Sequence, residues 1–340
     1  MVETLTRTAR TLTRTETRKI RPAPSWIVIA LLVAGCIFLA IGSMRSALFA
    51  QQTVTGLASG GIYASLAVAL VLIYRATEVV NFSQGAIATF TTYIAWQLME
   101  WGLAYWGAFF LTLAIAFVGG ILLELAAIRP VERAGTLTVV IVTIGLLILI
   151  EGSVGWIWSP EVKFMPPAFP SRPIHVGGVA FTLQDLGTIG VSIGAVVLLW
   201  LFFQFTKVGL GMRAAALRPS AARLVGVRVS WMLSLGWGLA AALGAVAGMM
   251  AAASPTVVLQ PSMMDTVLIY AFAAAVLGGL ESAAGALIGG LAIGVMLNLL
   301  GSYVSWVTPQ LLLPTTFVLM LIVLLIKPSG LFGRARVRKV

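Results

Sequence analysis

Only 10% of the 340 residues are charged, whereas 60% are hydrophobic and the mean hydropathy is +1.03. Soluble domains carry about 25% charged residues because their surface faces water. This composition excludes a soluble globular protein. The long apolar runs, such as 26–44 and 311–326, lack the alternation of membrane β-strands. We therefore predict an all-α, polytopic transmembrane helix bundle of about 8–10 membrane helices, with possible half-helices.

The net charge of +11 does not indicate a nucleic-acid-binding protein. The basic residues lie mainly at the two ends and in one internal segment, as expected when loop charges set the orientation of a membrane protein. The single cysteine, Cys36, excludes an intrachain disulfide, and the single histidine, His175, lacks partners for a metal site. The chain has no G-x-x-x-x-G-K-[ST] phosphate loop and no catalytic polar cluster. We therefore expect neither an enzyme nor a cofactor in this chain.

The chain divides into a tail, a long apolar region and a second tail. Residues 1–25 are rich in Thr and Arg, which predicts a disordered basic cytoplasmic tail, and 327–340 form a basic tail without acids. The transmembrane domain is expected over 26–326. Its predicted spans are 26–44, 53–74, 82–99, 104–127, 136–158, 186–206, 231–252, 265–280, 284–303 and 309–326. The third and eighth segments are short enough to be half-helices or re-entrant segments.

Two long loops differ sharply in charge. The loop 159–185 is rich in proline, which forbids a helix there, and its charges nearly balance. The loop 207–230 carries five basic residues and no acid. By the positive-inside rule the first is expected outside the membrane and the second in the cytoplasm. Ten spans also place both termini on the cytoplasmic side.

The basic loop 207–230 has the composition of a folded element. Its Ala, Leu and Arg residues favour helix. Pro219 suits a first helical turn and Gly226 suits the position just after a helix end, which predicts two short helices broken near Arg218. This predicts a docking element for a cytoplasmic partner. The alternative is a solvated loop that only sets topology.

Polar residues and glycines inside the apolar region have two interpretations. Asn81, Ser83 and Gln84 are costly in lipid, so they are expected to line a wet path or to bond neighbouring helices. The paired glycines favour close helix packing, with the lining of a path as the alternative. Two GxxxG pairs occur, Gly285 with Gly289 and Gly290 with Gly294.

The acidic residues argue against an ion-coupled carrier without excluding one. Such carriers usually place carboxylates near the membrane midplane. Here Glu124 and Glu151 lie toward the ends of predicted spans, Asp265 opens a span, and Glu281 lies between two short helices. An ion-coupled secondary carrier therefore stays as the alternative to a permease energised by another subunit.

Five stretches in order resemble the branched-chain amino acid ABC transporter permease family, and more closely its shorter permease subunit. They are Gly56–Ser65, Asn81–Ala86, Arg213–Val227, Ala274–Gly285 and Lys327–Gly333. Within the third, Ser220-Ala221-Ala222 followed by Gly226 resembles the Glu-Ala-Ala-x-x-x-Gly coupling motif of ABC permeases, with Ser in the Glu place. Ala86 and Glu281 also depart from the family pattern, and residues 1–50 are not covered.

The resemblance implies a subunit that carries branched-chain or related amino acids, or, as an alternative, urea or amides. It implies a second homologous permease, two cytoplasmic ATPase subunits that hold the ATP, an extracytoplasmic solute-binding protein and a bacterial inner membrane. The ATPase-coupling residues would be Arg213, Arg218, Ser220, Ala221, Ala222, Arg223 and Gly226. The solute-pathway residues would be Asn81, Ser83, Gln84, Gly278, Gly279 and Glu281.

Overall fold

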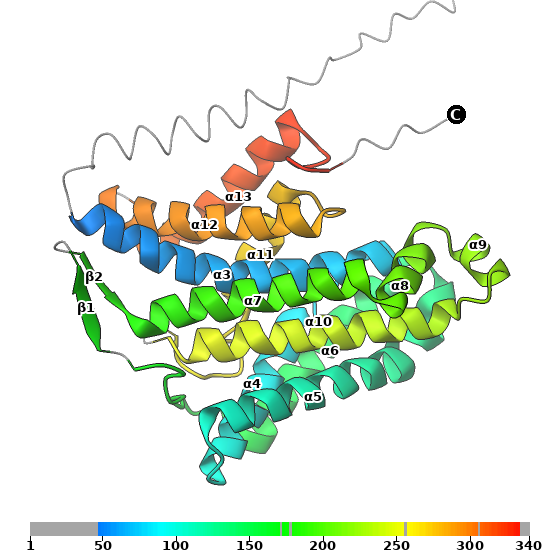
Figure 1. The fold of residues 1–340 in the computed structure, drawn as a ribbon, viewed down its shortest axis with the longest axis horizontal. Coiled ribbons are helices and arrows are strands. Elements are labelled where there is room, and N and C mark those ends of the chain that lie inside the picture. Colours follow the sequence, from blue (N-terminus) through cyan, green and yellow to red (C-terminus); the bar gives the residue numbers. More distant parts are fainter. Residues whose placement is uncertain (1–46, 171, 177–178, 255–256, 305–306, 334–340) are drawn as a thin grey trace, which may run out of the picture.

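The computed structural model describes residues 47–170, 172–176, 179–254, 257–304 and 307–333 (Figure 1). The predicted tail 1–25, the predicted span 26–44 and residues 334–340 lie outside the described residues. The helices that precede the basic loop are α3 (Ala47–Thr77), α4 (Gln84–Glu100), α5 (Tyr105–Leu123), the π-turn η1 (Glu124–Ile128), the 3-10 segment η2 (Arg129–Ala134), α6 (Thr136–Trp158) and α7 (Leu183–Phe205). The remaining helices are α8 (Lys207–Leu217), α9 (Pro219–Leu224), α10 (Val229–Ala252), α11 (Asp265–Gly278), α12 (Ala283–Tyr303) and α13 (Pro309–Ile326).

The described residues form a polytopic helix bundle, which confirms the predicted fold class. Seven helices are long and apolar enough to cross a membrane: α3, α5 with its continuation to Glu132, α6, α7, α10, α12 and α13. Two more helices are shorter: α4 has 17 residues, and the apolar helix α11 has 14. These are the two segments that the sequence marks as possible half-helices.

Helices α3 and α10 form the centre of the bundle. In their most apolar stretches 78% and 83% of residues are buried, against 11% for the peripheral helix α13. The outward faces of the peripheral helices carry large apolar side chains, for example Leu325 at 85% exposure and Ile148 at 65%. Lipid tolerates such side chains and water does not, so this surface fits a bilayer.

Helix α12 is held between two neighbours by its glycine pairs. An added Cβ at Gly290 would lie 2.4 Å from the Cα of Ala64 on α3, and one at Gly294 would lie 2.3 Å from the Cα of Gly60. The other pair faces α11, where a Cβ at Gly289 would lie 2.4 Å from the carbonyl oxygen of Ala274. Small residues let backbones approach this closely in lipid, so the close-packing interpretation of these glycines is confirmed.

The long loop 159–185 contains a β-hairpin that the sequence does not predict. Strand β1 (Pro173–Val176) pairs antiparallel with β2 (Val179–Thr182). The loop is also fixed to the segment before α11, because the backbones of Lys163 and Leu259 exchange two hydrogen bonds of 2.9 and 3.0 Å. The prolines do exclude a helix, but Pro173 is the last of them and begins β1, so two four-residue strands fit after it. The hairpin adds a small extended element to an otherwise helical protein.

The hairpin and the α8–α9 segment lie at opposite ends of the bundle (Figure 1). Tryptophans are exposed near the hairpin end, where α4 stops before Trp101 and α6 carries Trp156. Phe205 and Trp231 are exposed at the other end. Aromatic residues gather at both membrane–water interfaces, so the helix axes run across the bilayer.

Candidate functional site

The basic loop folds as two short helices that are broken where the sequence predicts. The Thr206 hydroxyl accepts a hydrogen bond from the Gly209 amide at 2.9 Å and caps α8. Helix α8 stops at Leu217, because Arg218 takes a non-helical conformation (φ −146°, ψ 82°) ahead of Pro219, the first residue of α9. A residue before proline avoids the helical region, which explains the break.

Helix α9 ends in a Schellman motif. Gly226 has φ +82°, a left-handed conformation that glycine adopts without strain. Its amide donates to the Arg223 carbonyl at 3.1 Å, and the Val227 amide donates to the Ala222 carbonyl at 3.0 Å. Both bonds belong to the motif, so the predicted helix-ending role of Gly226 is confirmed. The motif turns the chain back toward α10.

Ala222 faces inward, whereas the rest of α9 faces outward. Ala222 is 4% exposed and packs with Ala215 of α8 and Val229 of α10 in a small separate core. The other predicted coupling residues beyond the break are exposed: Arg218, Ser220, Ala221, Arg223 and Gly226. Ala222 therefore holds α9 against its own chain and offers little surface to a partner.

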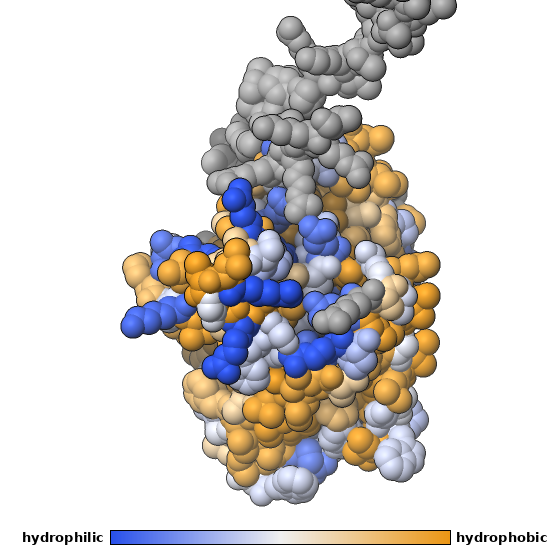
Figure 2. Space-filling model, turned by 90° about the vertical axis from the view of Figure 1, so that its right-hand side faces the viewer, coloured by the Kyte–Doolittle hydropathy of each residue, from blue (hydrophilic) through white to orange (hydrophobic). Residues whose placement is uncertain are grey.

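The outward face of the α8–α9 segment combines cations with exposed apolar side chains. Leu217, Leu224 and Val225 are 75%, 89% and 78% exposed. Figure 2 views this end of the molecule and shows hydrophilic residues gathered on it, with apolar surface around them. Apolar side chains that stand among charges on a protein end mark an interaction surface.

A basic cleft opens between η2, α9 and the start of α10. It comprises two adjoining cavities of about 560 and 470 Å³, both lined by Arg129, Arg223 and Ser230, with Arg228 in the larger one. Arg129 pairs with Glu124, and Glu132 lines the smaller cavity. Arg223 and Arg228 add two further cations, so the cleft keeps a net positive charge. The cleft suits an acidic protein surface.

Helix α4 begins deep inside the bundle, at the predicted polar motif. Asn81, Ser83 and Gln84 are at most 1% exposed. The Asn81 side chain bonds both others: its Oδ1 accepts from the Ser83 hydroxyl at 2.7 Å, and its Nδ2 donates to Gln84 Oε1 at 3.2 Å. Gln84 Nε2 donates to the carbonyl of Ala240, near the midpoint of α10, at 2.9 Å. These groups face protein and fix the interior start of α4.

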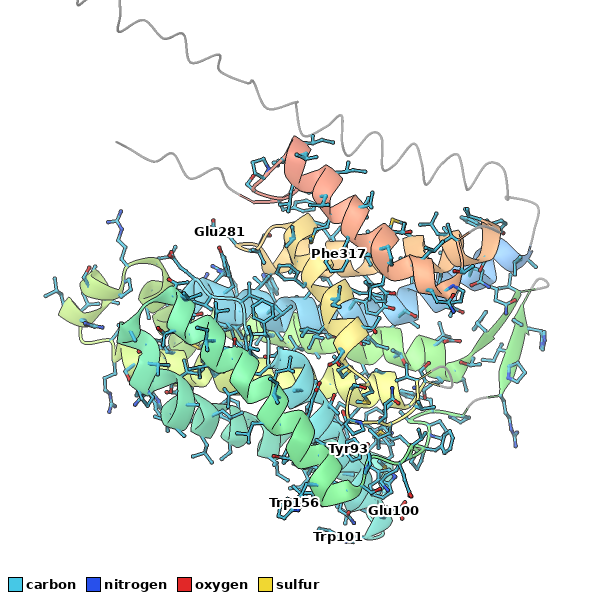
Figure 3. The ribbon with its side chains drawn as sticks, turned by 180° about the vertical axis from the view of Figure 1, so that it is seen from behind. Tyr93, Glu100, Trp101, Trp156, Glu281 and Phe317 are labelled. Atoms are coloured by element: carbon cyan, nitrogen blue, oxygen red, sulfur yellow. The ribbon has the colours of Figure 1, made fainter. Side chains whose placement is uncertain are left out.

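The turn between α11 and α12 brings four glycines into backbone contact in two pairs. A Cβ at Gly278 would lie 2.1 Å from the Gly285 carbonyl oxygen, and Gly279 has φ +101° beside the backbone of Gly333. Close backbone approach at Gly278 and the left-handed conformation of Gly279 explain why glycine is needed at these two predicted pathway positions. Glu281 is exposed at this turn, away from the ends of α4 and α6, where Glu100, Trp101 and Trp156 lie (Figure 3).

A model of the family described as "Branched-chain amino acid transport system / permease component" matches residues 52–326. The chain belongs to this permease family. It is 29% identical over 307 residues to the high-affinity branched-chain amino acid transport system permease protein LivH of Salmonella typhimurium, covering 86% of this chain and 98% of LivH. A probable LivH of Methanocaldococcus jannaschii is 30% identical over 79% of this chain and 87% of its own length. Among solved structures, PsaBC from Streptococcus pneumoniae in complex with Fab covers 86% of this chain with TM-score 0.45 and 14% identity.

Membership gives this permease its general role. It is the membrane-spanning transport subunit of an ABC importer, not an enzyme, and separate ATPase subunits bind the ATP. Permeases of this kind work with ATPase and binding-protein partners. The resemblance inferred from the five sequence stretches is confirmed.

Two clusters in this permease are missed by the sequence reasoning. Glu124 is 2% exposed, pairs with Arg129 at 3.2 Å and accepts from the Ser234 hydroxyl of α10 at 2.6 Å. Glu151 of α6 faces Asp265 at the start of α11, and its Oε1 is shielded from solvent with no hydrogen-bond partner among the described residues. Nothing in the local sequence signals that these acids meet partners from distant helices.

Proposed function

We propose that this permease imports a branched-chain or related amino acid, driven by ATPase subunits that dock on α8–α9. The family match over residues 52–326 carries the proposal. The curated relatives with the fullest coverage are named for branched-chain amino acid transport. A second homologous permease would complete the path, an extracytoplasmic binding protein would deliver the solute, and the assembly would lie in a bacterial inner membrane.

The docking surface follows from exposure and charge. Ser220, Ala221 and Arg223 stand on the outward face of α9, and Leu224 and Val225 supply apolar contact beside them. The basic cleft would receive acidic side chains of the ATPase. Arg213 has a different role within the segment, because its Nη1 donates to Gln204 at the end of α7 at 3.1 Å. It would hold α8 in place while α9 meets the partner.

The proposed orientation places α8–α9 and both termini in the cytoplasm. The basic segment then lies on the cytoplasmic side, and the nearly neutral hairpin loop lies outside. The hairpin would face the binding protein. This arrangement also matches the ends of the helices, since the hairpin and α9 lie at opposite ends of the bundle.

The solute pathway is proposed beside the interior starts of α4 and α11. These starts meet, because a Cβ at Gly85 would lie 3.3 Å from the Met264 carbonyl oxygen and from Leu268. Helix N-termini within a membrane protein attract anionic groups, such as the carboxylate of an amino acid. Glu151 and Asp265 bring negative charge for an ammonium group. Asn81, Ser83 and Gln84 would hold the start of α4, and Gly278, Gly279 and Glu281 would form the cytoplasmic end of the path.

Uptake by the reconstituted complex tests this function. The permease, its second permease, its ATPases and its binding protein are placed in vesicles, and uptake of labelled leucine, isoleucine, valine, urea and acetamide is measured with and without ATP. ATP-dependent uptake of the branched-chain amino acids is expected. ATP-dependent uptake of urea or acetamide alone would reassign the solute, and uptake driven by an ion gradient without ATP would establish a secondary carrier.

A further inference from the structure

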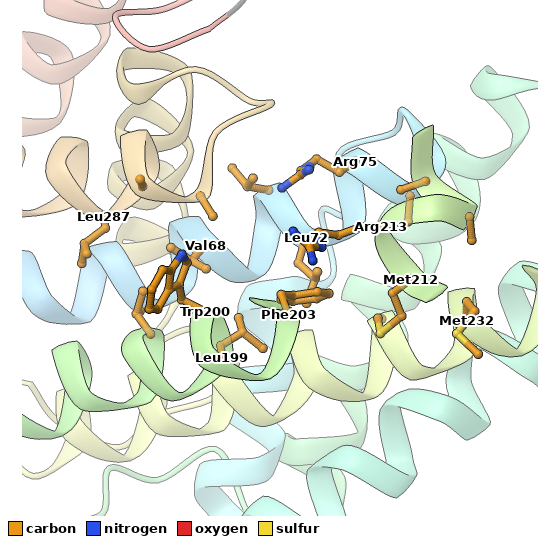
Figure 4. A pocket seen from close by; sticks show the side chains of 18 of the residues that line it. Val68, Leu72, Arg75, Leu199, Trp200, Phe203, Met212, Arg213, Met232 and Leu287 are labelled. Atoms are coloured by element: carbon orange, nitrogen blue, oxygen red, sulfur yellow. The ribbon is translucent and has the colours of Figure 1, made fainter. Parts of the chain in front are cut away.

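A mostly apolar cavity lies where α3, α7, α8, α10 and α12 meet, near the α8 end of the bundle (Figure 4). Its volume is about 330 Å³. Neither the coupling segment nor the proposed pathway accounts for it. Its apolar wall includes Val68, Leu72, Val196, Trp200, Phe203 and Leu287.

Two arginines stand at one side of this cavity. Arg75 is exposed two residues before the end of α3, and Arg213 comes from α8 (Figure 4). The two guanidinium groups repel each other electrostatically, and the carboxylate of Glu281 also acts on Arg75. Arg213 Nε is shielded from solvent and has no hydrogen-bond partner among the described residues. Two cations against one acid leave a net positive charge and an unused donor beside an apolar space.

We propose that this cavity binds one anionic phospholipid of the cytoplasmic leaflet. Its phosphate would lie on Arg75 and Arg213, and the first part of an acyl chain would lie along Leu72 and Trp200 toward Val68. Val68 and Arg75 are seven residues apart, which is about 10 Å along the helix and enough for part of one chain. Basic pockets between membrane helices on the cytoplasmic side suit anionic lipid headgroups. The assignment to the cytoplasmic leaflet rests on the proposed orientation, whereas the lipid site itself does not.

The charges favour a lipid over the chain's own apolar segment 26–44. That segment contains no charged residue and follows a basic tail, so it would bring no anion to the arginines. An apolar peptide from a partner would likewise bring no anion to the two arginines. A phospholipid alone among these occupants supplies a long apolar chain and a negative charge in one molecule.

Native mass spectrometry of the assembled transporter tests the site. The full complex is purified from nanodiscs that hold phosphatidylglycerol and phosphatidylcholine, and the retained phosphatidylglycerol is counted. Replacing both arginines (Arg75→Gln with Arg213→Gln) is expected to weaken retention about fivefold for each arginine lost. The pair Arg75→Lys with Arg213→Lys keeps the charge and most of the retention. Lys207→Gln with Arg172→Gln removes two exposed cations that do not line the cavity, and retention stays unchanged.

A steric variant separates binding from misfolding. Ala284 lines the cavity and is exposed, so Ala284→Trp fills space without changing charge and is expected to expel the lipid while the complex still assembles. Equal retention by the wild type, the double glutamine variant and Ala284→Trp would overturn the site. Efficient cross-linking of Ala284→Cys to the native Cys36 in lipid-replete membranes would also overturn it, because segment 26–44 would then fill the cavity. Lipid retention is measured independently of transport. If the wild-type complex took up no amino acid, the proposed function would be refuted, but the lipid site would not.

Discussion

Ala221 and Ala222 are neighbours in sequence with opposite environments. Ala221 is exposed on the outward face of α9, and Ala222 is buried against α10. Ala221→Trp is therefore expected to block ATPase docking and leave the permease stable, whereas Ala222→Trp should disturb the small core that holds α9. Thermal unfolding of the purified permease and co-purification of the ATPase separate the two effects. Normal co-purification with Ala221→Trp would contradict the docking surface.

Glu124 joins the end of α5 to α10 through Arg129 and Ser234. Replacement by leucine removes a charged hydrogen-bond acceptor from both partners, and Arg129 still reaches solvent in part. We expect Glu124→Leu to lower the free energy of unfolding by about 2 kcal/mol. Glu132 is exposed in η2, so Glu132→Leu is the control and should have almost no effect. Equal denaturation midpoints for the two variants would show that the cluster contributes nothing.

Ser83 lies at the interior start of α4 and tests the pathway. In a background without Cys36, cysteine at position 83 should react with a water-soluble thiol reagent to an extent that changes with nucleotide on the ATPase. Water reaches the site in that case only while the path is open on one side. Cysteine at Thr112, a fully buried position on α5, is the matched control and should stay unreactive. Protection of position 83 in every nucleotide state would leave the polar motif with a packing role alone.

The long helices are predictable because lipid requires about 20 apolar residues for a straight crossing. The sequence therefore indicates α3, α6, α7, α10, α12 and α13 and the coupling break at Pro219. The interior start of α4 is less predictable, because it depends on a hydrogen bond from Gln84 to a helix 156 residues away. The π-turn η1 leaves no mark in composition, and the hairpin strands are too short to show a pattern.

The glycines of α12 make a prediction about helix packing. The leucine side chain of Gly290→Leu would clash with the backbone of α3 at Ala64. Only a separation of the two helices could relieve this clash. Overpacking of this kind typically costs about 1–3 kcal/mol, and contact with backbone places this variant at the upper end. Gly301→Leu is the control, because only the Leu312 side chain lies near it, at 3.9 Å. Fluorescence-detected unfolding of both variants in detergent measures the difference, and equal midpoints would contradict the close crossing.

At the scale of the whole molecule, orientation is the property that the charges determine. Single cysteines at the exposed positions Arg172 and Ser220 are introduced in a Cys36→Ser background. An impermeant maleimide on intact cells should label position 172 and not 220, since the hairpin loop is expected outside and α9 inside. Labelling of 220 after membrane disruption shows that the site is accessible. The reverse pattern would overturn the orientation and the docking assignment together.

Helix α10 connects the docking segment to the interior of the membrane without a joint. It begins three residues after Gly226, and the carbonyl of Ala240 near its midpoint holds Gln84. Ala240 is eleven residues after Val229, which is about 16 Å along the helix. A stiff helix moves along its axis as a rigid body, so α10 would transmit an axial displacement from its first residue to its midpoint. A displacement of α9 by the ATPase would therefore move the start of α4 by nearly the same distance. A proline substituted in α10 between Val229 and Ala240 would kink the helix and uncouple the two sites.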